Sequence, residues 1–365
     1  MENSEYVPAR VFIEESSTNF PLTQRILKKL SSVPQEVISN PQALIEKIRE
    51  GQDAIGEGKK YLLLTRQKGE FIKRCPCSPG HVSCRYFIIN LDLNCPLDCS
   101  YCILQSYLSN PLVTIQINLE DLWPQLDRFL AKHRGGTVRV GTGELGDSLA
   151  LDHLTENSKD LLASFKKKDK VLFELKTKTT NIRNLLDAEP SENVVISWSL
   201  NSTQAAADEE HGAPPVGDRI EAARSIVQRG FSVGFHFDPL IRHPGWEEGY
   251  GEVVRRMLDR VPVSRIRWIS LGSLRFPPAL KPIIRARFPR TKMIYEELVP
   301  GKDGKLRYFR PLRLELYERL MDYIREGGGE RIPLYLCMES PEIWRELKKK
   351  KRGKESFKSL LSPLG

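Results

Sequence analysis

The sequence predicts an α/β protein, an open, partial βα barrel of about six parallel strands preceded by an α-rich N-terminal extension. Three observations lead to this prediction. From residue 86 onward, short apolar runs alternate with helical patterns, which is typical of βα units in a parallel sheet. The apolar runs number six or seven, fewer than the eight of a closed barrel. Unusual polar residues follow several of the runs, at the edge where the loops of such a sheet gather.

The N-terminal extension is assigned to residues 1–85. Helical patterns cover 21–30 and 41–50, and a segment rich in Cys, Pro and Gly follows at 68–84. The chain begins without a basic segment followed by an apolar one, and no apolar stretch reaches the roughly 18 residues that a membrane span needs. We therefore expect a cytoplasmic protein with no membrane partner.

The barrel is assigned to residues 86–340. The predicted strands are 86–93, 136–144, 170–178, 193–201, 231–240, 265–273 and 332–340. The predicted helices are 119–133, 161–170, 181–189, 218–230, 250–261 and 313–326. Residues 341–365 form a basic C-terminal tail, whose run at 348–354 is interpreted as a solvated helix end or, alternatively, as a nucleic-acid contact.

The charge balance makes a polyanionic partner such as DNA a reasonable hypothesis. The 365 residues carry a formal net charge of +9, with a sequence pI near 9.1. A DNA-facing groove is one interpretation of the basic and aromatic residues Arg265, Arg267, Trp268, Arg275, Tyr308, Arg310 and Arg313. An ordinary strand with one solvated face and a well-solvated basic surface explain the same residues equally well.

Three of the seven cysteines, Cys95, Cys99 and Cys102, lie within eight positions. In a chain without secretion signals, such a cluster indicates metal or redox chemistry rather than disulfides. Zinc sites usually close with four ligands, and no histidine lies nearby to complete this set. A cubane iron-sulfur cluster has four irons, so three thiolates leave one iron free for a substrate or cofactor.

With Tyr101 before the last cysteine, this motif resembles that of the radical S-adenosylmethionine (SAM) superfamily. The resemblance implies a partial barrel, a [4Fe-4S] cluster on the three cysteines and bound SAM. It also implies that the reduced cluster cleaves SAM to a 5′-deoxyadenosyl radical, which abstracts hydrogen from a substrate. Tyr101 becomes a candidate for cofactor binding and catalysis.

Four more residues at predicted strand ends match the superfamily by position. The GTGE segment ending at Glu144 resembles the glycine-rich motif that binds the SAM amine, and a carboxylate suits an ammonium group. Lys178 is then the candidate partner of the SAM carboxylate. Ser199 and Asn201 are candidates for binding the methionine part and the ribose hydroxyls.

From about residue 60 onward the chain is similar to the spore photoproduct lyase family. The matching segments are CPLDCSYCILQSYL, LGDSLALDHLT with Asp147, SWSLN, DRIEAARSIVQRG and HPGWEEGY at 243–250. The family resemblance implies repair of an ultraviolet-induced thymine dimer, the spore photoproduct, in DNA. It also implies an electron donor such as flavodoxin or ferredoxin.

The chain departs from the family pattern at two positions. Glu144 stands where the lyases carry a hydrogen-donor cysteine, and Ile103 stands where they carry a tyrosine that relays hydrogen toward SAM. Two alternatives therefore stay open: a radical SAM enzyme of this family with a different substrate, and a nucleic-acid-binding iron-sulfur protein without lyase activity.

The other four cysteines have two interpretations each. Cys337, at the end of the last predicted strand, is either a substitute hydrogen donor or a buried, inert thiol. Cys75, Cys77 and Cys84, with His81 nearby, either form a second metal or cluster site or are reduced and structural.

Overall fold

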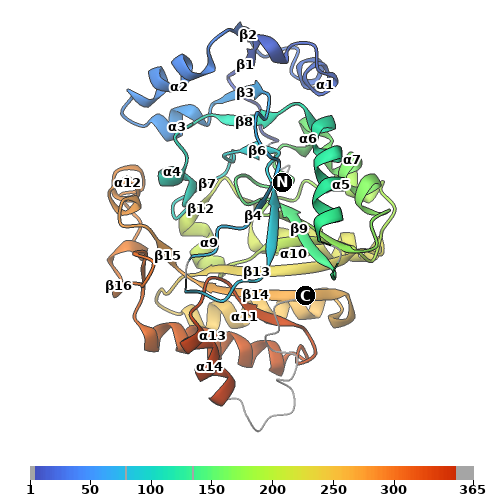
Figure 1. Ribbon diagram of the computed structural model, residues 1–365. Coiled ribbons are helices and arrows are strands. Elements are labelled where there is room, and N and C mark those ends of the chain that lie inside the picture. The colour runs from blue at the N-terminus through green and yellow to red at the C-terminus, as the bar shows by residue number, and fades with distance from the viewer. Residues whose placement is uncertain (1–4, 79, 134, 351–365) are drawn as a thin grey trace.

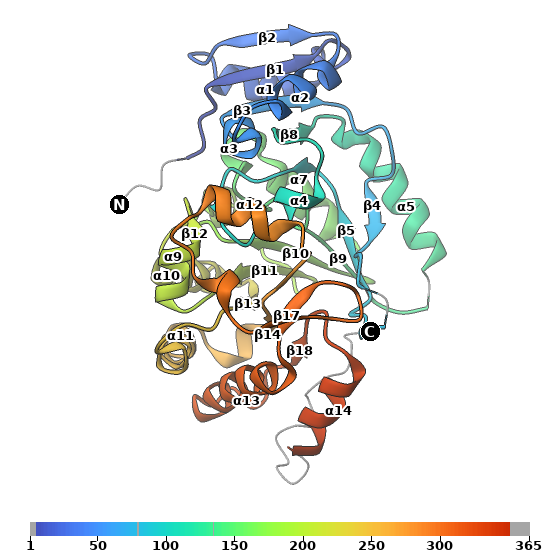
Figure 2. The ribbon, with the colours of Figure 1, turned by 90° about the vertical axis from the view of Figure 1, so that its left-hand side faces the viewer.

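The computed structural model describes residues 5–78, 80–133 and 135–350. Two sheets dominate it, a smaller one at the N-terminal end and a larger one in the body of the molecule (Figures 1 and 2). Within the described residues no helix is both long and apolar enough to cross a membrane.

The larger sheet is the predicted partial barrel. In spatial order it comprises β18 (Leu334–Leu336), β14 (Ile266–Ser273), β13 (Ser232–Leu240), β11 (Val194–Ser199), β10 (Val171–Thr177), β9 (Val138–Thr142), β5 (Tyr86–Ile89) and β4 (Ile72–Arg74). Seven of these described strands are parallel, and only β4 is antiparallel to its neighbour. Helices and loops bury most residues of these strands on both faces, which explains why they appear in the sequence as continuous apolar runs.

The helices predicted between the strands are confirmed, with bounds that differ by several residues. They are α5 (Leu122–Lys132), α7 (Asn157–Phe165), α8 (Arg183–Leu186), α10 (Val216–Gln228), α11 (Trp246–Arg260) and α13 (Arg310–Glu326). Helices α10, α11 and α13 form a neighbouring series along the outside of the sheet (Figure 2). The start of the predicted tail forms α14 (Pro341–Lys350), which includes the first three residues of the basic run at 348–354; residues 351–365 lie outside the described residues.

The N-terminal extension contains the two predicted helices, α1 (Pro21–Lys29) and α2 (Pro41–Arg49), followed by a short α3 (Ala54–Gly58). It also contains strands that the sequence analysis did not predict. Its sheet has the order β2 (Gln35–Ile38), β1 (Arg10–Glu14), β3 (Tyr61–Thr65), β8 (Val113–Gln116) and β6 (Asp92–Leu93). Because β6 and β8 come from beyond residue 85, the extension and the barrel segment build this sheet together.

The remaining elements are short and lie mainly around the rim of the larger sheet. They are α4 (Leu104–Tyr107), α6 (Asp152–Thr155), α9 (Thr203–Glu209), α12 (Leu280–Arg287), β7 (Asp98–Cys99), β12 (Glu210–His211), β15 (Arg275–Phe276), β16 (Leu298–Pro300) and β17 (Leu306–Tyr308). Single 3-10 turns cover Glu15–Ser17, Leu119–Asp121, Val263–Arg265 and Met293–Tyr295.

Gly141, near the end of β9, allows the close approach of a buried tyrosine. A Cβ atom added at Gly141 would lie 1.9 Å from the Tyr86 hydroxyl oxygen and 2.6 Å from the Glu174 carbonyl oxygen. We expect Gly141→Ala to lower the free energy of unfolding by about 1–3 kcal/mol, because the buried neighbours must shift. Urea denaturation measures this loss. Gly69→Ala is the matched control, since no neighbouring heavy atom lies within 4 Å of its added Cβ; equal losses in the two variants would contradict the prediction.

Candidate active site

The three-cysteine loop lies just after β5, at the C-terminal edge of the larger sheet. Within it, β7 pairs antiparallel with β12, and Cys99 is the register partner of Glu210. The side-chain amide of Asn94 donates to the carbonyl oxygen of Leu112 at 2.9 Å, which fixes the start of the loop. The loop is therefore held by strands that are distant in the sequence.

Asp98, between the cysteines, ties the loop to two other parts of the chain. Its carboxylate lies 2.8 Å from the Lys59 ammonium and 2.9 Å from Nη2 of Arg287. Lys59 belongs to the N-terminal extension and Arg287 ends α12. The loop geometry thus depends on contacts that no local motif encodes.

The cysteine thiols of this loop are shielded from water to different degrees. Cys99 is buried, while Cys95 and Cys102 are half-buried. Burial raises the pKa of Cys99 to about 12 even though Lys178 acts to lower it, and burial raises the pKa of Cys95 well above its ordinary value. Metal binding at these thiols must therefore release protons.

Three thiols fall short of the four ligands of a structural zinc site and leave one iron of a cubane cluster without a protein ligand. In the described part of the chain, no three Cys, His, Asp or Glu side chains converge closely enough to hold one metal ion. A tetrahedral zinc draws its thiolates tightly together, with Zn–S distances of about 2.3 Å. A cubane binds each thiolate at a separate iron, so it accepts a wider set of cysteines.

Lys178 provides a positive charge beside this loop. Its ammonium lies 5.5 Å from the centroid of the Tyr101 ring, and it forms no ion pair with a carboxylate of the described residues. Burial acts to lower the pKa of Lys178, but negative charge on Cys99 and Glu210 raises it overall. A protonated ammonium without a carboxylate partner is well suited to binding the carboxylate of a ligand.

Glu210 joins the predicted residues into one site, although the sequence analysis missed it. Its carboxylate lies 2.6 Å from Nη1 of Arg219, and both side chains are almost fully buried. It also accepts a hydrogen bond from the Tyr101 hydroxyl. One sequence signal could have revealed the pair. Arg219 stands on the apolar face of the predicted 218–230 helix, where Ala223 and Ile226 are also buried, and a buried arginine needs an acidic partner.

Ser199 and Asn201 lie where β11 ends, as predicted, and both are buried. The Asn201 amide donates to the Pro239 carbonyl oxygen at 3.2 Å and lies 3.5 Å from the Glu210 carboxylate. Its side-chain oxygen accepts from the Tyr250 hydroxyl. Because the Asn201 side chain already forms hydrogen bonds within the protein, its role in this structure is to connect β13, α11 and Glu210.

Glu144 follows the end of β9 by two residues. Its carboxylate is 3.7 Å from the ammonium of Lys176, a residue of β10, and Lys178 comes directly after that strand. Burial raises the pKa of Cys75, and the negative charge of Glu144 raises it further. Glu144 therefore borders both the predicted SAM site and the Cys-rich segment. Ile103 is 36% exposed directly after Cys102.

A charged network inside the sheet was also missed. Nε2 of His236 lies 2.7 Å from a Glu174 carboxylate oxygen, and Arg139 lies 3.8 Å from the other oxygen. The Arg139 guanidinium stacks over the Trp268 ring at 4.4 Å. His236 lies inside β13, whose end at Leu240 agrees with the predicted strand over 231–240.

The other four cysteines lie on two segments that contact each other. Cys337 follows β18, and Nη2 of Arg275 lies 3.5 Å from its sulfur. Cys75, Cys77 and Cys84 belong to the connection between β4 and β5. This connection reaches the end of β18, where the Val82 amide donates to the Glu339 carbonyl oxygen at 3.0 Å.

The hypothesis of a groove lined by Trp268, Tyr308 and nearby arginines was wrong. Trp268 and Tyr308 are fully buried, so neither ring can stack on a base. Arg275 forms a buried pair with Asp238 at 2.8 Å, and Arg265 lies at the opposite end of β14 from the rim. Arg310 and Arg313 are paired with Glu346 and Glu339.

Arg219 is expected to be essential for stability because it neutralises buried Glu210. We expect Arg219→Met to lower the free energy of unfolding by about 3–5 kcal/mol, since it leaves an unpaired buried charge. Urea denaturation followed by circular dichroism measures the change. Arg224→Met on the same helix is the control: its exposed pair with Glu221, at 3.2 Å, should contribute less than about 1 kcal/mol. Similar losses of unfolding free energy in both variants would show that the buried Arg219–Glu210 pair is no more important for stability than the exposed pair.

A family model describing spore photoproduct lyase matches residues 6–311 of the chain. The spore photoproduct lyase of a Geobacillus species is 26% identical over 300 residues, covering 80% of this chain and 86% of the relative. That of Bacillus subtilis is also 26% identical, with 80% and 85% covered.

Solved structures show the same fold. A Tyr-to-Phe variant of a spore photoproduct lyase superposes with a TM-score of 0.80 at 23% identity, over 92% of this chain and 99% of that one. A doubly substituted variant with bound AdoMet and dinucleoside spore photoproduct gives a TM-score of 0.77 at 24% identity, over 92% and 99%.

Proposed function

This chain is a member of the spore photoproduct lyase family, and we propose that it is a radical SAM enzyme that reverses the spore photoproduct in DNA. The observation that carries the proposal is the arrangement at the rim of the sheet. A loop that carries three thiols lies beside Lys178, whose ammonium is 5.5 Å from the centroid of the Tyr101 ring in that loop and forms no ion pair with a carboxylate of the described residues. That arrangement suits a cluster with one open iron and an amino acid bound beside it.

Cys95, Cys99 and Cys102 hold the [4Fe-4S] cluster in this proposal. One-electron reduction of cluster-bound SAM supplies the radical chemistry. The three thiols must bind as thiolates, and the raised pKa values of Cys95 and Cys99 mean that cluster assembly is favoured by higher pH. The contacts of Asp98 with Lys59 and Arg287 keep the loop in position while the cluster binds.

The chain's own residues then orient SAM. Lys178 pairs with its carboxylate, Glu144 accepts from its amine, and the Ser199 hydroxyl bonds the methionine part. Asn201 and Tyr101 contribute through Glu210, because both contact that carboxylate. Tyr101 also covers the Lys178 ammonium with its ring, which shields the ion pair from water.

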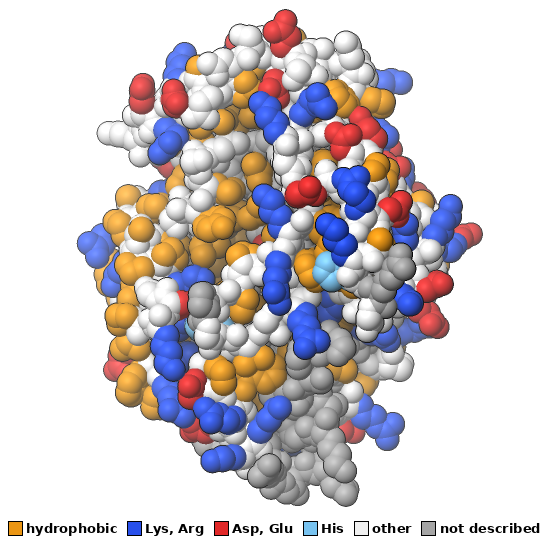
Figure 3. Space-filling view, in the orientation of Figure 1, with side chains coloured by type: hydrophobic (Ala, Val, Ile, Leu, Met, Phe, Trp, Pro, Cys, Tyr) orange, Lys and Arg blue, Asp and Glu red, His pale blue; other side chains and the backbone are white. Residues whose placement is uncertain are grey.

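DNA and a small electron-transfer protein complete the proposed system, and both are cytoplasmic partners. Lys and Arg side chains follow the face over β4, where Lys73 and Arg74 are exposed (Figure 3). A basic stripe of this kind suits contact with phosphates. Flavodoxin or ferredoxin is the class of donor that we propose for cluster reduction.

Hydrogen return to the product is the step at which this chain must differ from the family pattern. Glu144 occupies the donor position, and a carboxylate cannot give up a hydrogen atom as a thiol does. The hypothesis that Cys337 replaces the donor has one supporting feature, its location at the C-terminal edge of the sheet. Glu144 and Ile103 also favour a second candidate function, hydrogen abstraction from a different substrate. The reaction assay below distinguishes the two functions.

Lys178 is the residue whose removal should separate SAM binding from cluster binding. We expect Lys178→Met to weaken SAM binding at least about tenfold, because one charge-assisted contact to the carboxylate is lost. Equilibrium dialysis with labelled SAM on the reconstituted protein measures the affinity. Iron content should stay unchanged, and Lys166→Met, on an exposed side chain, should bind SAM normally. Unchanged affinity in Lys178→Met would remove this assignment.

The reaction is tested under anaerobic conditions with the reconstituted, reduced protein. We expect 5′-deoxyadenosine and thymidine products when SAM and a dinucleoside spore photoproduct are supplied, and neither with Cys99→Ala. Mass spectrometry quantifies both. SAM cleavage without lesion reversal would support the different-substrate alternative, and absence of SAM cleavage would favour an iron-sulfur protein without lyase activity.

A further inference from the structure

The Cys-rich connection between β4 and β5 folds against the end of β18. The Cys75 amide donates to the Tyr86 carbonyl oxygen at 2.9 Å, which extends the β4–β5 pairing to the first cysteine. The Cys77 amide donates to the Cys75 carbonyl oxygen at 2.8 Å, so these two cysteines flank a tight turn. The Val82–Glu339 hydrogen bond then joins the connection to the segment that follows Cys337.

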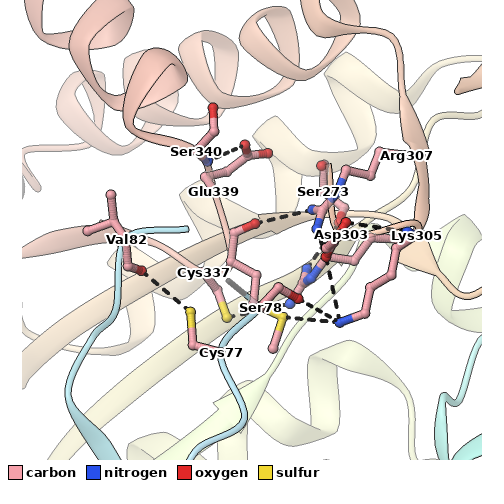
Figure 4. A network of polar contacts seen from close by, with 12 residues as sticks. Cys77, Ser78, Val82, Ser273, Asp303, Lys305, Arg307, Cys337, Glu339 and Ser340 are labelled. Atoms are coloured by element: carbon pink, nitrogen blue, oxygen red, sulfur yellow. Dashed lines mark hydrogen bonds and ion pairs between the residues drawn. The ribbon is translucent and has the colours of Figure 1, made fainter. Parts of the chain in front are cut away.

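Lys305 joins the same two segments through side chains. Its ammonium lies 3.1 Å from the Ser78 hydroxyl and 3.8 Å from the Met338 sulfur. Ser78 follows Cys77, and Met338 follows Cys337. Figure 4 shows Cys77 and Cys337 within this network of contacts.

Backbone pairing brings the segments of the four cysteines together. In the antiparallel β4–β5 ladder Arg74 is the register partner of Phe87, and the Cys75 amide continues this pairing to Tyr86. Cys77 and Cys84 are therefore on the two facing arms of the connection. Cys337 joins them from the end of β18, because the Glu339 carbonyl oxygen accepts from the Val82 amide.

The backbone beside these cysteines adopts a costly conformation. Among the described residues, four non-glycine residues have positive φ, and three of them are next to a cysteine. Asn94 (φ 63°) precedes Cys95, Arg85 (φ 54°) follows Cys84, and Met338 (φ 50°) follows Cys337. Asparagine tolerates this region, whereas arginine and methionine seldom adopt it outside sites where the conformation serves a function.

We infer that Cys75, Cys77, Cys84 and Cys337 bind a second iron-sulfur cluster. Four thiolates are the ordinary ligand set of [2Fe-2S] and [4Fe-4S] clusters. Zinc also binds four thiolates, so the metal itself is identified by the measurement below. His81 is not needed in this set.

This assignment limits what the second cluster can do. With a thiolate for each available position, it leaves no iron open to SAM, so its chemistry is electron transfer or structural support. It also excludes a hydrogen-donor role for Cys337, because a thiolate ligand carries no S–H bond. The inference concerns this chain's ligands and does not depend on the identity of the substrate.

Iron content tests the inference in protein reconstituted without oxygen. We expect the Cys95→Ala, Cys99→Ala, Cys102→Ala triple variant to keep about two or four irons per chain with matching sulfide. The unsubstituted protein should hold about four irons more than this variant. His81→Ala is the control and should keep the full content. Full iron in Cys337→Ala would remove that ligand and return Cys337 to the donor hypothesis.

A spectroscopic measurement on the unsubstituted protein tests the same inference without depending on the folding of any variant. In the reduced, unsubstituted protein, Mössbauer spectra should show two iron populations, and added SAM should change only one of them. One population that responds entirely to SAM, or stoichiometric zinc in place of the additional iron, would overturn the second cluster. Loss of SAM cleavage with two intact populations would count against the proposed function alone.

Discussion

The buried pair between Glu210 and Arg219 is the interaction on which the rim of the sheet depends. Glu210 is paired in register with Cys99, accepts from Tyr101 and lies beside Asn201, so one carboxylate connects the cysteine loop, β11 and α10. A buried ion pair adds little net stability compared with an apolar pair, but an unpaired buried charge is costly. The pair is therefore better understood as fixing the positions of the site residues.

A second buried carboxylate, Glu174, is also held by polar side chains inside the larger sheet. Glu174 lies between His236 and Arg139, and these contacts outweigh the effect of burial and lower its pKa. Polar atoms that lack a protein partner also remain buried nearby, including the hydroxyls of Ser197 and Ser270. Unsatisfied polar groups are expensive in a core but ordinary in a site that receives a ligand. The larger sheet thus encloses a charged interior suited to binding rather than a purely apolar core.

The sequence predicted the barrel well because its signals are local. Strands buried on both faces give continuous apolar runs, and the helices between them have one apolar face. The spacing of Cys95, Cys99 and Cys102 is likewise local, and it led to the cluster and to the family.

What the sequence could not predict depends on long-range contacts. Tyr101 and Glu210 are 109 positions apart, and β8 joins the N-terminal sheet from beyond residue 85. No short pattern reports such pairs. The groove hypothesis failed for a related reason, because the alternation around Trp268 does not reveal that both faces of β14 are covered.

The cysteine count gains a simple explanation from the two thiolate groups. Three ligands for one cluster and four for the other account for all seven cysteines of the chain. If every thiol is a ligand, none remains to return hydrogen to a product radical, and Glu144 cannot do so. One O–H group at the C-terminal edge of the sheet is the Tyr101 hydroxyl, which donates to Glu210 beside Lys178. In this proposal Cys337 is a ligand and not a free thiol, so hydrogen return would fall to another group of the protein or to an external reductant.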